Sequence, residues 1–258
     1  MSEEKKIEPI QAVERALQVL EILSEKGSMS LNDLHKEIKV NKASLLRLTF
    51  TLVQNGYLDK HPQTGNYSLT TKAYEIGVRA IQSLDKFSLI NSILADLSTE
   101  TGRIAQFSIE DHHQLLCLQS IGQKESTFSI YTNVGIRSPL YCTSAGKAIL
   151  ACYTNSQIME KWKKMDVKPL TENTITDVHN FLKEISEVRN RKYAVDREEN
   201  EYHVFCVGAA IMTGTNTPIG AISISGRSLS ADEEKHIAEV LLPSAKLLSG
   251  LMGYISAI

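Results

Sequence analysis

Small and cationic side chains gather between residues 42 and 61. A helix that enters the major groove of DNA needs such a face, because small side chains allow close approach and cations neutralise phosphates. We therefore expect this set to contact double-stranded operator DNA. It comprises Lys42, Ala43, Ser44 and Arg47, spaced to share the outer face of one predicted helix, and Lys60 and His61 on the hairpin that follows.

Two hydroxyls, Ser223 and Ser225, occupy positions i and i+2 of a predicted strand, so both face the same side of it. Ser144, Ala145 and Gly146 begin a predicted helix, whose free N–H groups and partial positive charge suit a carboxylate. If the fold brings them together, these groups could hold a small organic acid by hydrogen bonds without a cationic side chain. The plainer alternative is that the serines are ordinary strand-edge hydroxyls.

The motifs of common enzyme classes are missing from the sequence. The SAGKA stretch lacks the glycine and lysine spacing of a phosphate loop, and no dinucleotide fingerprint or Gly-x-Ser-x-Gly elbow occurs. Metal-ligand spacing is equally missing around the histidines, which include His112, His113, His179 and His203. We therefore expect neither an enzyme nor a bound cofactor or metal.

Composition indicates a water-soluble chain with one local cationic region. The 258 residues are 42% hydrophobic and carry a net charge of −2, yet residues 39–72 carry a net charge of +4. Any nucleic-acid binding must therefore come from that region. The scattered cysteines without a CxxC pair, an N-terminal stretch without an apolar signal and the short apolar runs together predict a cytoplasmic protein that binds no membrane.

Residues 9–71 show the element order helix, helix, turn, helix, hairpin. The first helix carries an apolar stripe from Ile10 to Leu20, with Val19 and Leu23 beside it, and is expected to stop at Gly27. Ser30 and Asn41 are the predicted N-caps of the next two helices. The predicted hairpin strands span 57–60 and 67–69. This order predicts a winged helix-turn-helix domain, followed by a linker helix over 72–86.

Residues 87–258 alternate helical and strand patterns, which predicts an α+β domain with one antiparallel sheet and helices packed on it. A loop is expected over 135–139. The predicted strands span 104–110, 114–121, 126–131, 204–213 and 219–225. Helices are predicted over 88–100, roughly 155–164 and 230–256, and two more begin near 143–146 and after Asp177, the first carrying Leu150 and the second Val188.

The chain resembles the IclR family of transcription regulators along essentially its whole length. The resemblance rests on the stretch from AVERALQVL to GNYSLT and on VGIRSPLYCTSAGKAILA, YAVDREENEYHVFCVGAAI and PIGAISISG. It implies a GAF-like effector domain and assembly into homodimers or homotetramers. It also implies a ligand pocket formed by Ser144, Ala145, Gly146, Asp196, Cys206, Ser223 and Ser225.

The chain departs from the family at several positions. His203 stands where the family usually has glycine, and Ala210 where it has proline, so the turn before the Cys206 strand is expected to differ. His203 is also a candidate to reach the pocket. Ala43 and Leu46 replace residues that are often polar in the family, which puts base contacts transferred from relatives in doubt.

The combined prediction is a transcription repressor whose DNA affinity is controlled by a small anionic metabolite. The sequence leaves open whether that metabolite is a keto acid, a sugar acid or an aromatic acid, and leaves open the operator, activation instead of repression, and dimer or tetramer. Two alternatives also stay open: a redox-sensing regulator that uses Cys206 or Cys142, and an enzyme that turns over its ligand.

Overall fold

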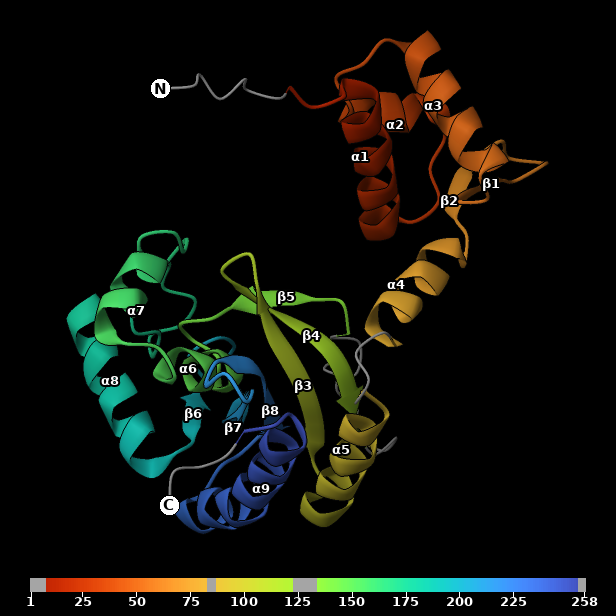
Figure 1. Ribbon diagram of the computed structural model, residues 1–258. Helices are drawn as coiled ribbons and strands as arrows, with labels where there is room; N and C mark the ends of the chain where they lie inside the picture. The colour runs from red at the N-terminus through yellow and green to blue at the C-terminus, as the bar shows by residue number, and fades with distance from the viewer. Residues whose placement is uncertain (1–7, 83–86, 123–133, 255–258) are drawn as a thin grey trace, which may run out of the picture. The chain divides into compact units, whose positions relative to one another are not determined.

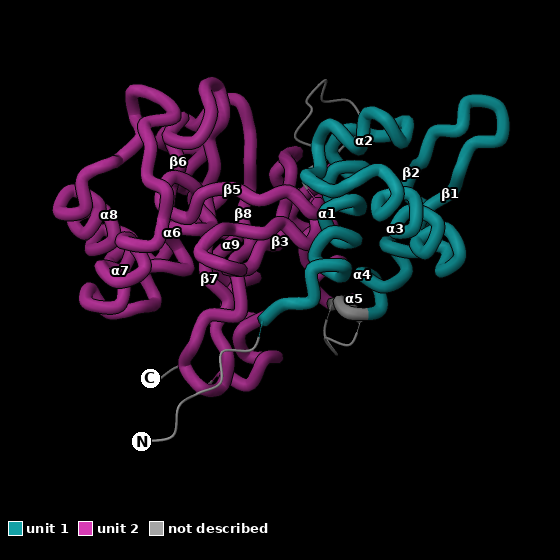
Figure 2. The backbone as a smooth tube through the Cα atoms, turned by 90° about the horizontal axis from the view of Figure 1, so that it is seen from above, with its two compact units in different colours: residues 1–85 teal, residues 86–258 magenta. Residues whose placement is uncertain are grey.

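The computed structural model describes residues 8–82, 87–122 and 134–254 (Figure 1). Its contacts divide the chain into two compact units, residues 1–85 and 86–258 (Figure 2). The strand predicted over 126–131 lies outside the described residues, as do residues 83–86 of the predicted linker helix. Within the described ranges, no helix is both long enough and apolar enough to cross a membrane.

The first unit has the predicted element order. Its helices are α1 (Gln11–Lys26), α2 (Leu31–Glu37), α3 (Lys42–Gln54) and α4 (Lys72–Gln82), and β1 (Leu58–Lys60) pairs antiparallel with β2 (Tyr67–Leu69). The predicted caps are present: Ser30 Oγ accepts from the N–H of Asp33 at 3.2 Å, and Asn41 Oδ1 accepts from the N–H of Ser44 at 2.8 Å. These side chains satisfy N–H groups that a helix start leaves free.

The core of this unit uses a different face of α1 from the stripe expected from the sequence. Val19 and Leu23 are buried, at 0% and 2% exposure, whereas Val13 and Leu17 are both 53% exposed. Two apolar stripes run side by side along this helix, so periodicity alone does not say which one the other helices cover. The neighbouring stripe with Val19 and Leu23 supplies the buried face, and Val13 and Leu17 of the first stripe remain exposed.

The second unit is built on a six-stranded antiparallel sheet of order β5-β4-β3-β8-β7-β6. Two strands correct the sequence prediction: β5 lies inside the expected loop, and β6 was not predicted. Both are too short, at three and four residues, to show an alternating pattern. The strands are β3 (Ile104–Asp111), β4 (Gln114–Ile121), β5 (Arg137–Pro139), β6 (Ala194–Arg197), β7 (Phe205–Met212) and β8 (Pro218–Gly226).

Helices cover both faces of this sheet (Figure 1). On one face, α5 (Phe87–Thr101) and α9 (Ala231–Leu251) pack on Phe107, Val207 and Ile222. On the other face, α6 (Ser144–Ala151), α7 (Asn155–Trp162) and α8 (Val178–Arg191) form a second core with Ala194 and Ala221. Successive residues of a strand point to opposite faces of the sheet, so alternate residues pack into two separate cores.

The start of α6 lies directly on the sheet. A Cβ atom on Gly208 of β7 would lie 2.8 Å from the backbone nitrogen of Ala145 and 2.8 Å from the carbonyl carbon of Ser144. Glycine at this position therefore lets the N-terminus of α6 approach the strands. The close approach places the first residues of α6 beside the side chains of β6, β7 and β8 on the same face.

Candidate functional site

The six residues predicted to contact DNA all lie on the surface of the first unit. Lys42, Ala43 and Arg47 are exposed on α3, and Ser44 is half-buried beside them. Lys60 and His61 are exposed at the hairpin, with the Lys60 ammonium 5.3 Å from the centre of the Tyr67 ring. Arg47 and Lys60 line one groove of about 570 Å³, so the structure brings α3 and the hairpin together.

Sequence reasoning did not select two further residues of that surface, Leu46 and Phe50. Their side chains are 48% and 61% exposed, and both line the groove that holds Arg47 and Lys60. The signal was available, because Ala43, Leu46, Arg47 and Phe50 follow one helical face at spacings of three and four residues.

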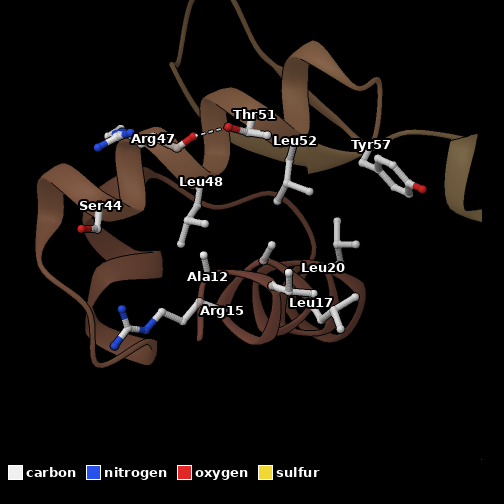
Figure 3. A pocket seen from close by; sticks show the side chains of 12 residues that line it. Ala12, Arg15, Leu17, Leu20, Ser44, Arg47, Leu48, Thr51, Leu52 and Tyr57 are labelled. Carbon is white, nitrogen blue, oxygen red and sulfur yellow. Dashed lines mark hydrogen bonds between the residues drawn. The ribbon is translucent and has the colours of Figure 1, made fainter. Parts of the chain in front are cut away.

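A second groove, of about 650 Å³, separates α1 from the other side of α3. Figure 3 shows Leu17 and Leu20 of α1 facing Leu48 and Leu52 of α3. Arg47 stands at the margin of this groove, where its carbonyl oxygen accepts from the hydroxyl of Thr51 at 2.9 Å. Helix α3 therefore borders apolar surface on two sides.

In the second unit, a cavity of about 80 Å³ lies between the start of α6 and the adjacent strands. Six of the seven predicted ligand residues line it: Ser144, Ala145, Asp196, Cys206, Ser223 and Ser225. Gly146 does not line it. A Cβ atom on Gly146 would lie 2.2 Å from the carbonyl oxygen of Leu140, so this glycine is needed for packing.

Strand register explains why the polar residues meet. Asp196, Cys206 and Ser225 are consecutive partners across β6, β7 and β8. The Cys206 thiol donates to Ser225 Oγ at 3.1 Å, and the Ser225 hydroxyl donates to Gln106 Oε1 at 3.3 Å. One oxygen of Asp196, Oδ1, accepts from the N–H of Glu199 at 2.8 Å.

Other polar residues of the cavity were not predicted. Gln106 and Ser108 alternate along an otherwise apolar strand, which is a pattern that sequence reasoning can use. The remaining residues come from loops and from β4 and β5, so their position is visible only in the fold. The unpredicted polar lining residues are Gln106, Ser108, Cys117, Ser138, Thr143, Asn200 and Glu201.

The polar side chains that line the cavity carry carboxyl, hydroxyl, amide and thiol groups, and Leu115, Ile136 and Val204 add apolar surface. Among the residues that the structure describes, no lysine, arginine or histidine lines it. Burial, reinforced by the nearby Glu199 carboxylate, raises the pKa of Asp196 to about 7. Burial, reinforced by the charge of Asp196, also raises the pKa of both the Cys206 and Cys142 thiols. These thiols are poorly placed to act as thiolates, which disfavours nucleophilic and redox chemistry here.

A buried lysine lies behind the cavity. Lys147 is 0% exposed, forms an ion pair with Glu199 and lies 3.5 Å from a carboxylate oxygen of Glu184. The Thr174 hydroxyl donates to the carbonyl oxygen of Glu199 at 2.6 Å. Sequence reasoning missed Lys147, although a lysine among the apolar residues of AGKAILA demands a buried partner. These contacts hold the loop after β6, which supplies Asn200 and Glu201 to the cavity.

His203 does not line the cavity. Its side chain is 80% exposed, with Nδ1 3.5 Å from a Glu198 oxygen, and its backbone has φ +61°. A positive φ favours glycine, which accounts for the glycine common at this position in the family. Over the described ranges, no three His, Cys, Asp or Glu residues cluster closely enough to hold a metal ion.

Both units of the chain match known proteins. Residues 78–249 match the model of the bacterial transcriptional regulator IclR C-terminal domain, and residues 12–62 match that of the IclR helix-turn-helix domain. The HTH-type transcriptional regulator KdgR of Escherichia coli is 26% identical over 97% of this chain and 96% of its own length. The DNA-binding transcriptional repressor YiaJ of Escherichia coli is 28% identical over 95% of this chain and 88% of its own length.

The fold also matches solved structures. One is an IclR homologue from Microbacterium hydrocarbonoxydans in complex with 4-hydroxybenzoate, which has a TM-score of 0.82 at 17% identity and covers 93% of this chain and 98% of its own. The matched families and relatives are transcriptional regulators and not enzymes. The chain therefore belongs to the IclR family of DNA-binding transcriptional regulators.

Proposed function

We propose that this protein is a repressor whose affinity for operator DNA is set by a small organic acid in the cavity of the second unit. The observation that carries the proposal is the cavity itself, where the N-terminus of α6 meets the hydroxyls of Ser223 and Ser225. Free N–H groups and hydroxyls are the donors that a carboxylate needs. The repressor YiaJ and the homologue bound to 4-hydroxybenzoate support this assignment.

The cavity favours a short acid over a bulky one. Its volume of about 80 Å³ is well below the roughly 300–1,000 Å³ of pockets that enclose drug-sized ligands. Hydroxyls of the ligand would find acceptors in Asp196 and Gln106, and its carboxylate would find the donors at α6. A short-chain keto or hydroxy acid meets both requirements.

In our proposal, Lys42, Ala43, Ser44, Arg47, Lys60 and His61 contact the operator. The protein acts as a homo-oligomer, because two recognition helices at a fixed separation are needed to read a two-fold operator. The ligand binds one arrangement of the assembly better than another, and residues 72–86 transmit the change to the DNA-binding units. Affinity for DNA and affinity for the ligand are then linked.

Fluorescence anisotropy tests this function directly. The full-length protein is titrated onto a duplex from immediately upstream of its own gene and onto a scrambled duplex, at two salt concentrations and with a panel of small carboxylates. We expect the protein to prefer the upstream duplex over the scrambled one. Its affinity for that duplex should weaken as the salt concentration rises, and one short-chain acid should change that affinity. Selective binding that no carboxylate alters would contradict the effector assignment. Equal binding to both duplexes would contradict sequence-specific recognition of the upstream duplex.

A further inference from the structure

We propose that Leu46 and Phe50 of α3 recognise thymine methyl groups in the operator, between phosphate contacts made by Arg47 and Lys60. The inference rests on the proposed DNA binding and adds a base preference to it. It assigns a partner to apolar side chains that the first unit leaves uncovered.

The two side chains form an exposed apolar pair. Leu46 and Phe50 are four residues apart on α3, at 48% and 61% exposure, and Ala43 extends the same stripe toward the helix start. Soluble proteins expose single apolar residues freely, but a contiguous apolar stripe marks a binding surface. Neither side chain belongs to the hydrophobic core of this unit, which includes Val19 and Leu23 of α1.

Charge around the pair favours DNA over a second protein copy. Arg47 and Lys60 line the same groove as Leu46 and Phe50. The only acidic residue between positions 39 and 72 is Asp59, whose carboxylate accepts from the N–H of Lys60 at 2.8 Å. Lysine, the residue type at position 60, is depleted from protein–protein interfaces relative to the rest of the surface. Cations that flank an apolar stripe instead match phosphates on either side of a groove.

Base chemistry then selects thymine. In the major groove, thymine alone among the four bases presents a methyl group, whereas the other bases present polar donors and acceptors. Leucine and phenylalanine have no hydrogen-bonding group, so a polar base edge covered by them would lose its bonds to water. Ala43 and Leu46 lie in the first two turns of α3, where recognition helices contact bases, and Phe50 lies one turn further along.

The test begins with selection of duplexes by the full-length protein from a random library, which establishes whether a preferred operator exists. Each thymine of that operator is then replaced by deoxyuridine, which lacks only the methyl group. For the wild type we expect about a fourfold loss of affinity at one or two positions per half-site, as for one buried methyl group. The Leu46→Ala or Phe50→Ala variant should bind the thymine operator and the deoxyuridine operator with equal affinity at the position that its missing side chain contacts.

Leu17→Ala is the matched control, because Leu17 is 53% exposed but lines the groove on the other side of α3. It should keep the wild-type ratio of thymine to deoxyuridine affinity, whatever its overall affinity. An operator without any position sensitive to deoxyuridine would overturn the methyl contact and leave the proposed function standing. Failure to select any sequence would overturn both. A lower oligomer mass in the two α3 variants, with the deoxyuridine effect retained, would assign the stripe to a protein interface.

Discussion

Asp196 lies in an environment unlike that of a surface carboxyl. It is 2% exposed on β6 and faces Glu199 of the following loop, Lys147 of α6, Cys206 of β7 and Cys142 before α6. Its pKa, raised from 3.8 to about 7, means that the folded chain holds a proton there that the unfolded chain releases. The resulting stabilisation is complete below about pH 4 and is lost as pH rises to about 7.

Asp196→Asn should therefore remove one pH-dependent part of stability. Between pH 4.5 and pH 8, the free energy of unfolding of the wild type should fall by on the order of 2–4 kcal/mol relative to that of this variant. This range follows because one pKa unit corresponds to about 1.4 kcal/mol. Denaturant unfolding of both proteins across this range measures the difference. Glu201→Gln, which changes an exposed carboxylate of the same cavity, is the control. Parallel stability curves for wild type and Asp196→Asn would rule out the burial effect.

Lys147 is the counter-charge of the buried Glu199. Lys147→Met should destabilise the chain by about 3–5 kcal/mol, because it leaves a carboxylate buried without its partner. The double variant Lys147→Met, Glu199→Gln should recover most of that loss, since it buries no net charge. Urea denaturation of the single and double variants measures both values. A single variant within about 1 kcal/mol of wild type would contradict the expected cost of leaving the Glu199 carboxylate unpaired.

At the scale of elements, local signals predicted the first unit well. Ser30, Asn41 and Gly27 mark helix ends through their own side chain or backbone, and each does so in the structure. The choice between two apolar stripes on α1 depends on tertiary packing, so periodicity did not resolve it. The same limit applies to β6, a short strand recognisable only through its pairing with β7.

For the cavity, the sequence resemblance located six residues that the fold brings together, but it did not find their surroundings. Gln106 reaches the cavity through the pairing of β3 with β8, two segments more than a hundred residues apart in the sequence. Asn200 and Glu201 arrive on a loop held by Lys147 and Thr174. Such neighbours follow from topology, and no local pattern in one sequence encodes them.

Gly208 tests how closely α6 must approach the sheet. Gly208→Ala should cost about 1–3 kcal/mol, because the new methyl group would press on the backbone of Ser144 and Ala145. Gly77→Ala in α4 is the matched control, since a Cβ atom there meets nothing within 4 Å and alanine favours the helix. Thermal unfolding should show a lower melting temperature for the first variant and an equal or higher one for the second. If both variants melt like wild type, α6 can move away from β7 without loss.

For the whole molecule, the charge distribution makes DNA binding a local property. The chain carries a net charge of −2, but residues 39–72 carry +4, so counterion release on binding must come from that region. When one side chain that neutralises a phosphate is removed, the slope of the logarithm of the DNA association constant against the logarithm of salt concentration falls in magnitude by about 0.9. Arg47→Ala and Lys60→Ala should therefore each flatten this slope by about that amount, without changing affinity for the acid.

Ser223→Ala gives the converse result if the two sites are separate. The serine lies in the second unit, is 5% exposed and lines the cavity, so its loss should weaken acid binding roughly three- to tenfold through one missing hydrogen bond. The salt slope of DNA binding without the acid should stay at the wild-type value, because no phosphate contact has changed. Anisotropy titrations at several salt concentrations, with calorimetry for the acid, measure both quantities. A flatter slope in Ser223→Ala would mean that the cavity residue alters the DNA contacts even when no ligand is bound, so that the linkage is already present in the empty protein.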